Sequence, residues 1–377
     1  MSLLALLTAQ GGTVPPSPVE PTPPPGVSAE PIRLLTLAQT VDAPVGTRTV
    51  TTAPLSGPAL IAGRTVPTSD LRLIGSLVNG DRGFIEPHSW EWQTDASEVV
   101  LRLKFGGGNM RAYQAFVDGV PLSSPYTRQD TEAQVRIPLG EPGVWHTIRV
   151  DLSGLLLTGV DTPHESRVQA TAPRKKLYIL GDSWVEGKSY RPKADGTGNE
   201  NGPGFEHMAF LTARLLNMAP DIGGIGGTGY VNRYPDASYG AQRRMDRLVA
   251  AKPDAVLVFG SINDGGNPDV EVRAKEVYQR LANELPGVPV LVCATQDWSE
   301  SDTPNATAPN PGHAAAVAVS PNVKGHVEPT VENWVTGAHK GLVNNVYDNA
   351  HLTTFGNRLY AEKLAQFIAK SLDIPAA

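Results

Sequence analysis

Three short motifs in the second half of the chain carry side chains suited to nucleophilic catalysis. Ser183 follows an apolar run in the motif Gly-Asp-Ser, where its hydroxyl could attack a substrate. Asn263 follows another apolar run, and its side-chain amide could stabilise a developing oxyanion. Asp348 and His351 are spaced so that a carboxylate can orient an imidazole as a general base. Each motif alone is weak, because Gly, Asp, Asn and Ser are also common turn residues.

A glycine-rich segment, residues 223–229, lies between these motifs in the chain. Glycines there allow backbone N–H groups to approach a substrate closely. The segment also matches the spacing G-x-G-x-x-G of dinucleotide-binding loops, at Gly224, Gly226 and Gly229. The context argues against that alternative, because a polar segment precedes the next helix and the candidate acidic residue, Asp246, lies within that helix.

The elements around these motifs predict an α/β fold. Apolar strands are expected at 175–180, 254–260 and 288–294, and amphipathic helices at 205–217, 241–251, 270–285 and 354–372. Apolar strands that alternate with amphipathic helices indicate a parallel sheet covered on both faces. Because ligands bind at the carboxyl ends of such strands, we expect Ser183 and Asn263 at one edge. Residues 295–347 lack periodicity, and a loop of this length has a function or contains short helices.

The first half of the chain has a different pattern. Between residues 45 and 170, short alternating runs separated by turns are typical of an all-β domain, a sandwich or jelly roll. Asp118-Gly119 is a hairpin signal between apolar neighbours. The proline-rich stretch before these runs cannot bury a core and should be extended. We therefore predict three parts, a proline-rich tether (1–44), a β-sandwich accessory domain (45–172) and a catalytic domain (173–377).

Composition argues against several classes of protein. The 32 basic and 38 acidic residues give a net charge of −6, which disfavours nucleic-acid binding. The lone Cys293 excludes an intramolecular disulfide and a cysteine-based zinc site. Since no H-E-x-x-H motif is present either, we expect neither a metal nor a cofactor. No apolar stretch suits a membrane span, and the N-terminus lacks the basic region of a signal peptide.

The order of the motifs GDSWVEG, the glycine-rich segment, GSIND and DNAHLT resembles the SGNH (GDSL-type) hydrolase family over residues 175–372. The resemblance implies a flavodoxin-like, three-layer α/β/α fold. It makes Ser183 the nucleophile, His351 the general base and Asp348 the partner that orients it. The G-x-S-x-G motif of α/β-hydrolases is missing, which favours this family over the lipase type.

The same resemblance implies an oxyanion hole. Its donors would be the backbone N–H groups of Ser183 and Gly227 and the side chain of Asn263, with Gly226 as the fallback for Gly227. One departure concerns the histidine motif, because the family usually has proline where this chain has Leu352-Thr353.

Four aromatic residues near the expected strand ends could stack on a sugar or line an acyl pocket: Trp184, Tyr190, Tyr230 and Trp298. For each, ordinary packing is an equal alternative.

The sequence thus predicts a serine esterase that removes an acyl group, above all acetyl, through an acyl-serine intermediate. A β domain before such a catalytic domain resembles carbohydrate esterases and SGNH domains of bacteriophage tail-associated proteins. We therefore expect a cell-surface polysaccharide or glycolipid as substrate, an extracellular or virion-associated location, and attachment to a larger assembly through the N-terminal segment. A non-catalytic glycan-binding or structural virion protein is the alternative. The β domain could bind glycan or serve as a structural cover.

Overall fold

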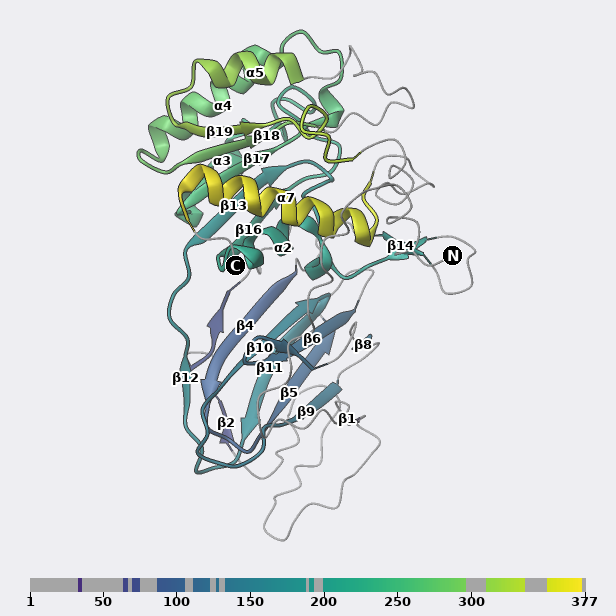
Figure 1. Cartoon of the computed structure of the whole chain (residues 1–377), viewed down its shortest axis with the longest axis vertical. Coiled ribbons are helices and arrows are strands. Elements are labelled where there is room, and N and C mark those ends of the chain that lie inside the picture. Colours follow the sequence, from purple (N-terminus) through teal and green to yellow (C-terminus); the bar gives the residue numbers. More distant parts are fainter. Residues whose placement is uncertain are drawn as a thin grey trace.

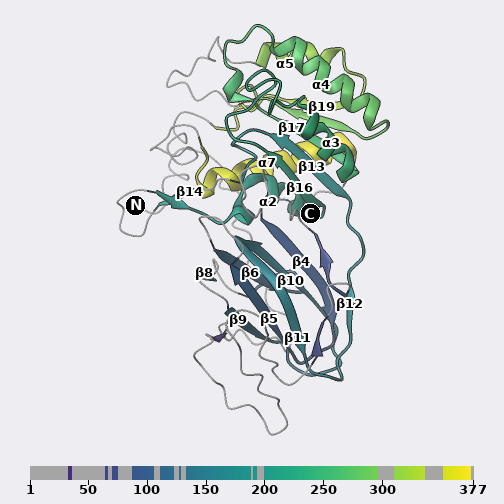
Figure 2. The ribbon, with the colours of Figure 1, turned by 180° about the vertical axis from the view of Figure 1, so that it is seen from behind.

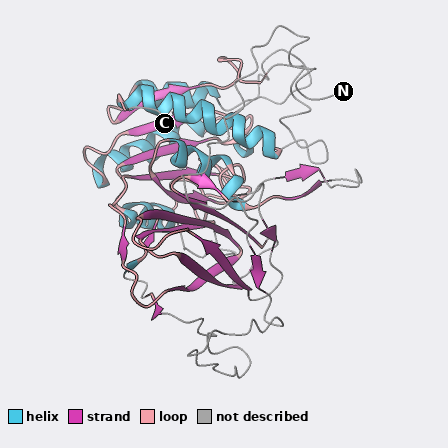
Figure 3. Ribbon diagram, turned by 60° about the horizontal axis from the view of Figure 1, so that its bottom comes forward, coloured by secondary structure: helices cyan, strands magenta, loops and turns pink. Residues whose placement is uncertain are grey.

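A computed structural model describes the residues 33–35, 64–66, 70–74, 87–105, 111–122, 127–128, 133–187, 190–192, 199–295, 310–335 and 351–374. A parallel sheet with its helices forms one end of the molecule, and antiparallel sheets form the other (Figure 1). Helices are concentrated in the part with the parallel sheet, as the colours of Figure 3 show.

The parallel sheet has five strands within the described residues, in the order β16-β13-β17-β18-β19. They are β13 (Lys176–Gly181), β16 (Ala219–Gly224), β17 (Ala255–Phe259), β18 (Val290–Cys293) and β19 (Val323–Val327). All four neighbouring pairs are parallel, so the carboxyl ends share one edge. The predicted α/β class with a parallel sheet is confirmed. The strands β16 and β19 were not expected from the sequence.

Helices cover both faces of this sheet because side chains alternate along its buried strands. Leu177 and Ile179 of β13 belong to the core with α2 (Met208–Leu215) and α7 (Thr354–Leu372). Tyr178 and Leu180 belong to the core on the opposite face, with α3 (Gln242–Ala251), α4 (Val270–Glu284) and α5 (Asn310–Ala318). The helix α5 and the strand β19 account for part of the segment that lacked periodicity.

Two antiparallel sheets precede the parallel one. The first has the order β1-β9-β5-β11-β2, and the second β12-β4-β10-β6-β7, with β3 beside β4 and β8 beside β6. Their bounds are β1 (Arg33–Leu35), β2 (Arg64–Thr65), β3 (Arg72–Leu73), β4 (His88–Thr94), β5 (Glu98–Phe105), β6 (Ala112–Val117), β7 (Val120–Pro121), β8 (Thr127–Arg128), β9 (Ala133–Pro138), β10 (His146–Ser153), β11 (Leu155–Thr162) and β12 (Val168–Ala170). Residues of both sheets form one hydrophobic core, which includes Trp92, Leu101, Tyr113 and Val135.

Two details of these sheets bear on the sequence predictions. Asp118 and Gly119 have φ angles of +51° and +84°, as a tight hairpin between β6 and β7 requires. Arg33–Leu35 pair with β9, so these three residues belong to a sheet and not to the predicted tether. The remaining residues of that tether, 1–32 and 36–44, lie outside the described residues.

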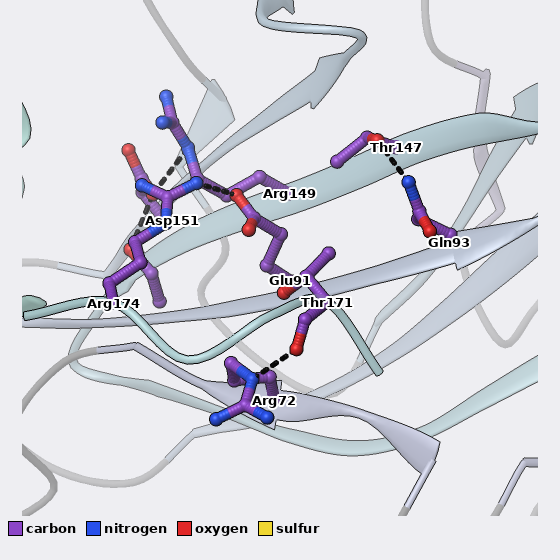
Figure 4. A network of polar contacts seen from close by, with 9 residues as sticks. Arg72, Glu91, Gln93, Thr147, Arg149, Asp151, Thr171 and Arg174 are labelled. Atoms are coloured by element: carbon purple, nitrogen blue, oxygen red, sulfur yellow. Dashed lines mark hydrogen bonds and ion pairs between the residues drawn. The ribbon is translucent and has the colours of Figure 1, made fainter. Parts of the chain in front are cut away.

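A charged cluster joins the antiparallel sheets to the helices of the parallel sheet. We define it as Glu91, Arg149, Asp151, Arg174 and Arg214. Asp151 of β10 is fully buried and lies 3.3 Å from Nε of Arg149 and 2.9 Å from Nη1 of Arg214, which belongs to α2. Arg174, in the link to β13, pairs with the buried Glu91 of β4 at 2.5 Å (Figure 4). Both views of the chain show α2 at this boundary (Figures 1 and 2).

The same boundary reaches the segment that leads into α2. The short helix η2 (Gly204–Glu206) begins with Gly204, whose N–H donates to Oγ of Ser153 at 3.0 Å. A Cβ atom on Gly204 would come within 3.0 Å of the Pro87 ring. The antiparallel sheets therefore contact the segment that leads into α2.

Candidate active site

Ser183 lies in a tight turn at the carboxyl end of β13. The backbone N–H groups of Val185 and Glu186 both donate to the carbonyl of Asp182 at 3.0 Å, which closes the turn. Ser183 is 9% exposed, so it is largely covered by neighbouring residues at the carboxyl edge of the sheet. The predicted position of the candidate nucleophile, at a strand end, agrees with the structure.

Asp182 connects this turn to the next strand end. Its Oδ1 accepts from the N–H of Trp184 at 2.9 Å, and its Oδ2 is 3.4 Å from Nδ2 of Asn263. Burial raises the pKa of Asp182 to about 6, although hydrogen bonds from Trp184, Ile262 and Ser261 act in the opposite direction. Asp182 thus holds the Ser183 turn and the Asn263 turn together.

The glycine-rich segment lies against Ser183. A Cβ atom on Gly226 would be 3.4 Å from Cβ of Ser183 and 2.6 Å from Oε2 of Glu186, so no larger residue fits without a shift. Gly227 has a φ of +71°, a conformation that favours glycine. The structure therefore brings both candidate glycines beside the candidate nucleophile.

A buried arginine fixes the shape of this glycine segment. Arg244 of α3 is 4% exposed, and its Nη2 donates to the carbonyls of Gly181 at 2.7 Å and Gly223 at 2.5 Å. Its Nη1 donates to Oγ1 of Thr228 at 2.9 Å and to the carbonyl of Ala237 at 3.1 Å. One guanidinium thus joins the ends of two strands to the loop that follows them. Sequence reasoning missed Arg244, whose only signal was a cation on the apolar face of a helix.

Asn263 lies in the short helix η3 (Ile262–Asp264) after β17. Ser261 caps this helix by accepting from the N–H of Asn263 at 3.1 Å. Both Nδ2 of Asn263 and Oγ of Ser261 donate to the carbonyl of Thr228, each at 2.9 Å. The Asn263 side chain therefore lies against the glycine segment, where the oxyanion prediction requires it.

Asp264 has a separate, structural task. Its carboxylate accepts hydrogen bonds from the N–H groups of Tyr230 at 2.6 Å, Val231 at 3.1 Å and Asn232 at 2.9 Å. Burial raises the pKa of Asp264, and these backbone hydrogen bonds act against that rise. The second acidic position of GSIND thus anchors the chain that leaves the glycine segment.

His351 lies just before α7 and interacts electrostatically with His207. It precedes Thr353, which caps α7 by accepting from the N–H of Gly356 at 3.1 Å. Its neighbour is His207, which is 1% exposed and caps α2 through the N–H of Ala209 at 3.3 Å. Asp348, the predicted partner of His351, lies outside the described residues.

His207 connects this side to the nucleophile turn. Burial, and next the charge of His351, lower the pKa of His207 to about 3, while a hydrogen bond with the backbone of Trp184 raises it. The imidazole of His207 is therefore neutral at pH 7 and lies between the Ser183 turn and His351. Sequence reasoning did not single out His207, because a histidine next to a helix start has many ordinary roles.

The aromatic predictions need correction in two cases. Trp184 is 3% exposed and packs against Phe259 and Tyr360, with ring centroids 5.7 Å and 5.5 Å away. Tyr230 is 1% exposed, and its hydroxyl bonds that of Tyr278 at 2.6 Å. Both rings lie in the hydrophobic cores and leave no face for a sugar. Tyr190 lies in the strand β14 (Tyr190–Pro192), which pairs with β15 (Asn199–Asn201), and Trp298 lies outside the described residues.

Two further observations concern the described ranges only. No group of three or more His, Cys, Asp or Glu side chains there could hold a metal ion. No helix there is long and apolar enough to cross a membrane. Cys293 is buried in β18, and burial raises the pKa of its thiol.

The parallel sheet, its two helical layers and the serine at a strand end define a protein of the flavodoxin-like SGNH type. Residues 179–359 match the model of the GDSL-like lipase/acylhydrolase family, and this part of the chain belongs to that family. The resemblance stated from the sequence is thereby confirmed. No curated protein matches the chain in sequence.

Solved structures share the fold over most of the chain. A family two carbohydrate esterase from Clostridium thermocellum, solved with cellohexaose, has a TM-score of 0.57 and 18% identity, covering 80% of this chain and 99% of that one. An acetyl xylan esterase from the rumen bacterium Butyrivibrio proteoclasticus has a TM-score of 0.53 and 15% identity, covering 82% and 97%. A salicylyl-acyltransferase from a tetracycline biosynthetic pathway has a TM-score of 0.60 and 17% identity, covering 83% and 100%.

These coverages extend beyond the family match at 179–359, so the likeness includes antiparallel strands as well as the parallel sheet. At such identities the likeness concerns the fold. The match to the lipase/acylhydrolase family model supports ester hydrolysis as the class of reaction. The predicted relation to bacteriophage tail proteins stays a prediction.

Proposed function

We propose that this protein is a serine esterase that removes an acyl group, above all acetyl, from a carbohydrate. The observation that carries the proposal is the close approach of the glycine segment to Ser183 at the carboxyl edge of the sheet. A Cβ atom on Gly226 would lie 3.4 Å from Cβ of Ser183. Ligands of parallel sheets bind at this edge. The carbohydrate esterases among the structural neighbours support the choice of substrate.

The reaction would proceed through an acyl-serine. His351 takes the proton of the Ser183 hydroxyl as its oxygen attacks the ester carbonyl carbon. The tetrahedral intermediate then collapses, and the alcohol leaves with the proton that His351 returns. Water repeats the sequence on the acyl-serine and releases the carboxylic acid. Asp348 would orient the imidazole of His351.

The oxyanion would be held by the backbone N–H groups of Ser183 and Gly227 and by Nδ2 of Asn263. Nδ2 carries two hydrogens, and one of them donates to the carbonyl of Thr228 at 2.9 Å. Among the described residues the second has a long contact of 3.4 Å with Asp182, and it is the hydrogen that we assign to the developing oxyanion. One such donor is typically worth about 10²–10³ in rate.

The natural substrate that we propose is an O-acylated polysaccharide or glycolipid of a cell surface. The predicted extracellular or virion-associated location, and the attachment through the N-terminal segment, remain part of this proposal. A glycan-binding or structural virion protein that retains the fold is the alternative.

A panel of esters tests the proposal, with p-nitrophenyl esters of short to long acyl chains beside acetylated xylan. We expect Ser183→Ala to reduce kcat by about 10⁴-fold or more, as removal of a serine nucleophile does in other enzymes. Ser320→Ala is the control, because its hydroxyl bonds the carbonyl of Ala316 at the end of α5 and lies on another element. A fluorophosphonate probe should label the wild type and not Ser183→Ala. Full activity of Ser183→Ala would refute the nucleophile, and failure of the wild type to react with both the esters and the probe would favour the binding protein.

A further inference from the structure

An arginine beside the glycine segment lacks an acidic partner among the residues that the structure describes. Arg233 is exposed in the turn formed by residues 230–237. Its guanidinium covers Gly227, since a Cβ atom on that glycine would lie 3.5 Å from Nη2 and 3.7 Å from Nε of Arg233. A Cβ atom on the neighbouring Gly226 would lie 3.4 Å from Cβ of Ser183. The guanidinium therefore lies next to the glycine whose N–H we assign to the oxyanion.

The backbone of the turn holds Arg233 in this place. Asp264 accepts hydrogen bonds from the N–H groups of residues 230–232, immediately before it. The carbonyl of Arg233 accepts from the N–H of Ala237 at 2.9 Å. Arg233 itself has a φ of +62°, the left-handed region that residues other than glycine rarely adopt. Glycine would adopt this conformation more easily. The presence of arginine instead indicates that its side chain has a function.

The charge of Arg233 stands out against its surroundings. Several arginines of the same part of the chain have a carboxylate partner: Arg247, Arg273, Arg280 and Arg358. Across the described ranges, no carboxylate lies within 4 Å of the Arg233 guanidinium. An unpaired guanidinium that faces a reaction site is available to a negative group of the ligand.

We infer that Arg233 binds a carboxylate of the substrate, carried by either the sugar or the acyl group of the ester. The planar guanidinium fork matches a carboxylate with two parallel hydrogen bonds, which an ammonium cannot reproduce. This inference rests on the proposed function and narrows it to acidic substrates, such as an acetylated uronate or the ester of a dicarboxylic acid.

Two matched pairs of substrates test the inference. The first pair is an acetylated methyl galacturonide and the corresponding acetylated methyl galactoside, which differ only in a carboxylate or a hydroxymethyl group at C6 of the sugar. The second is mono-p-nitrophenyl succinate and p-nitrophenyl butyrate, in which a carboxylate or a methyl group ends an acyl chain of otherwise equal length. For each pair, the ratio of kcat/KM for the acidic over the neutral substrate is measured in the wild type, Arg233→Ala, Arg233→Lys and Arg243→Ala. Arg243 is an exposed arginine of α3 and serves as the control.

We expect the wild type to prefer the acidic member of one pair, and that pair tells which half of the ester carries the carboxylate. Arg233→Ala should lower this ratio by about 10- to 100-fold, the range for loss of a charge-assisted hydrogen bond. Arg233→Lys should retain part of the preference because it keeps the charge, and Arg243→Ala should retain all of it. If Arg233→Ala leaves both ratios within about twofold of the wild type, the inference is overturned while the proposed function stands. A wild type that hydrolyses none of the four esters overturns both.

Discussion

The charge of Asp151 should stabilise the folded protein by several kcal/mol, although this residue lies far from Ser183 in the chain. Its carboxylate is fully buried and contacts two guanidinium groups, at 3.3 Å from Arg149 and 2.9 Å from Arg214. It also accepts from Oγ of Ser89 at 2.5 Å. The guanidinium groups of Arg149 and Arg214 stack on the ring of Phe116, at 3.8 Å and 4.4 Å from its centroid. Asp151→Asn would keep the shape of the side chain and remove its charge.

The size of the effect follows from the charged cluster. At an effective dielectric constant of about 20, each contact at roughly 3 Å contributes about 5 kcal/mol of Coulomb attraction. The substitution also removes the cost of burying a charged carboxylate, which offsets part of the lost Coulomb attraction. The substitution leaves Glu91 alone against three arginines, and burial already lowers the pKa of Arg149 to about 10. Breaking a buried ion pair in this way typically costs about 3–5 kcal/mol, which we expect for Asp151→Asn.

Equilibrium unfolding in urea measures this difference. Glu276→Gln is the matched control, because its partner Arg273 is 2.8 Å away on the exposed face of α4. We expect that control to change the free energy of unfolding little, because exposed ion pairs contribute little to stability. The double variant Asp151→Asn/Arg149→Met should recover part of the loss, since it also removes the cation left unpaired. A loss for Asp151→Asn no larger than that of Glu276→Gln would refute the reasoning.

Two further changes test the core and the glycine segment. His313 is buried, and within the described part of the chain neither of its ring nitrogens has a hydrogen-bond partner. Burial lowers its pKa from 6.5 to about 3. His313→Leu should therefore stabilise the fold by about 1–3 kcal/mol in urea unfolding at pH 7. The gain should grow as pH falls from 6.5 towards 3, because only the unfolded wild type then binds the proton, and a destabilised variant would contradict this. Gly227→Ala should reduce kcat for p-nitrophenyl acetate by at least about 10-fold. Gly287→Ala is the control, because Gly287 has a similar φ of +82° and lies in open space, and it should leave kcat unchanged. Equal losses of kcat in the two variants would contradict a role of Gly227 in catalysis.

The arrangement of the parallel sheet could be predicted where the signal is local. The apolar strands and amphipathic helices predicted between 175 and 372 correspond to β13, β17, β18 and the helices α2, α3, α4 and α7. Strand β16 has the sequence APDIGG, in which Pro, Asp and Gly disfavour an isolated strand. It forms because β13 supplies a complete parallel partner from Lys176 to Gly181. Strand β19 was missed for a similar reason, since VKGHV is a partly exposed edge strand with a glycine at its centre.

The roles of single side chains were harder to predict when they depend on distant partners. Trp184 and Tyr230 lie next to candidate site residues in the chain, yet the helices α7 and α4 bury their rings. Arg244, which shapes the glycine segment, contacts Gly181 from 63 positions away. No local sequence pattern predicts such a hydrogen bond, because the two groups come together only after folding. The bond matters to stability because the fold excludes water from both groups.

The sequence by itself determined the class of fold, the family and the candidates Ser183, Asn263 and His351, because strand ends and short motifs are local properties. Tertiary structure alone decided what surrounds them. It placed Gly226 against Ser183, the neutral His207 beside His351 and the guanidinium of Arg233 over Gly227. The physical reason is that burial and electrostatic interactions act between neighbours in space, and packing, not order in the chain, selects those neighbours.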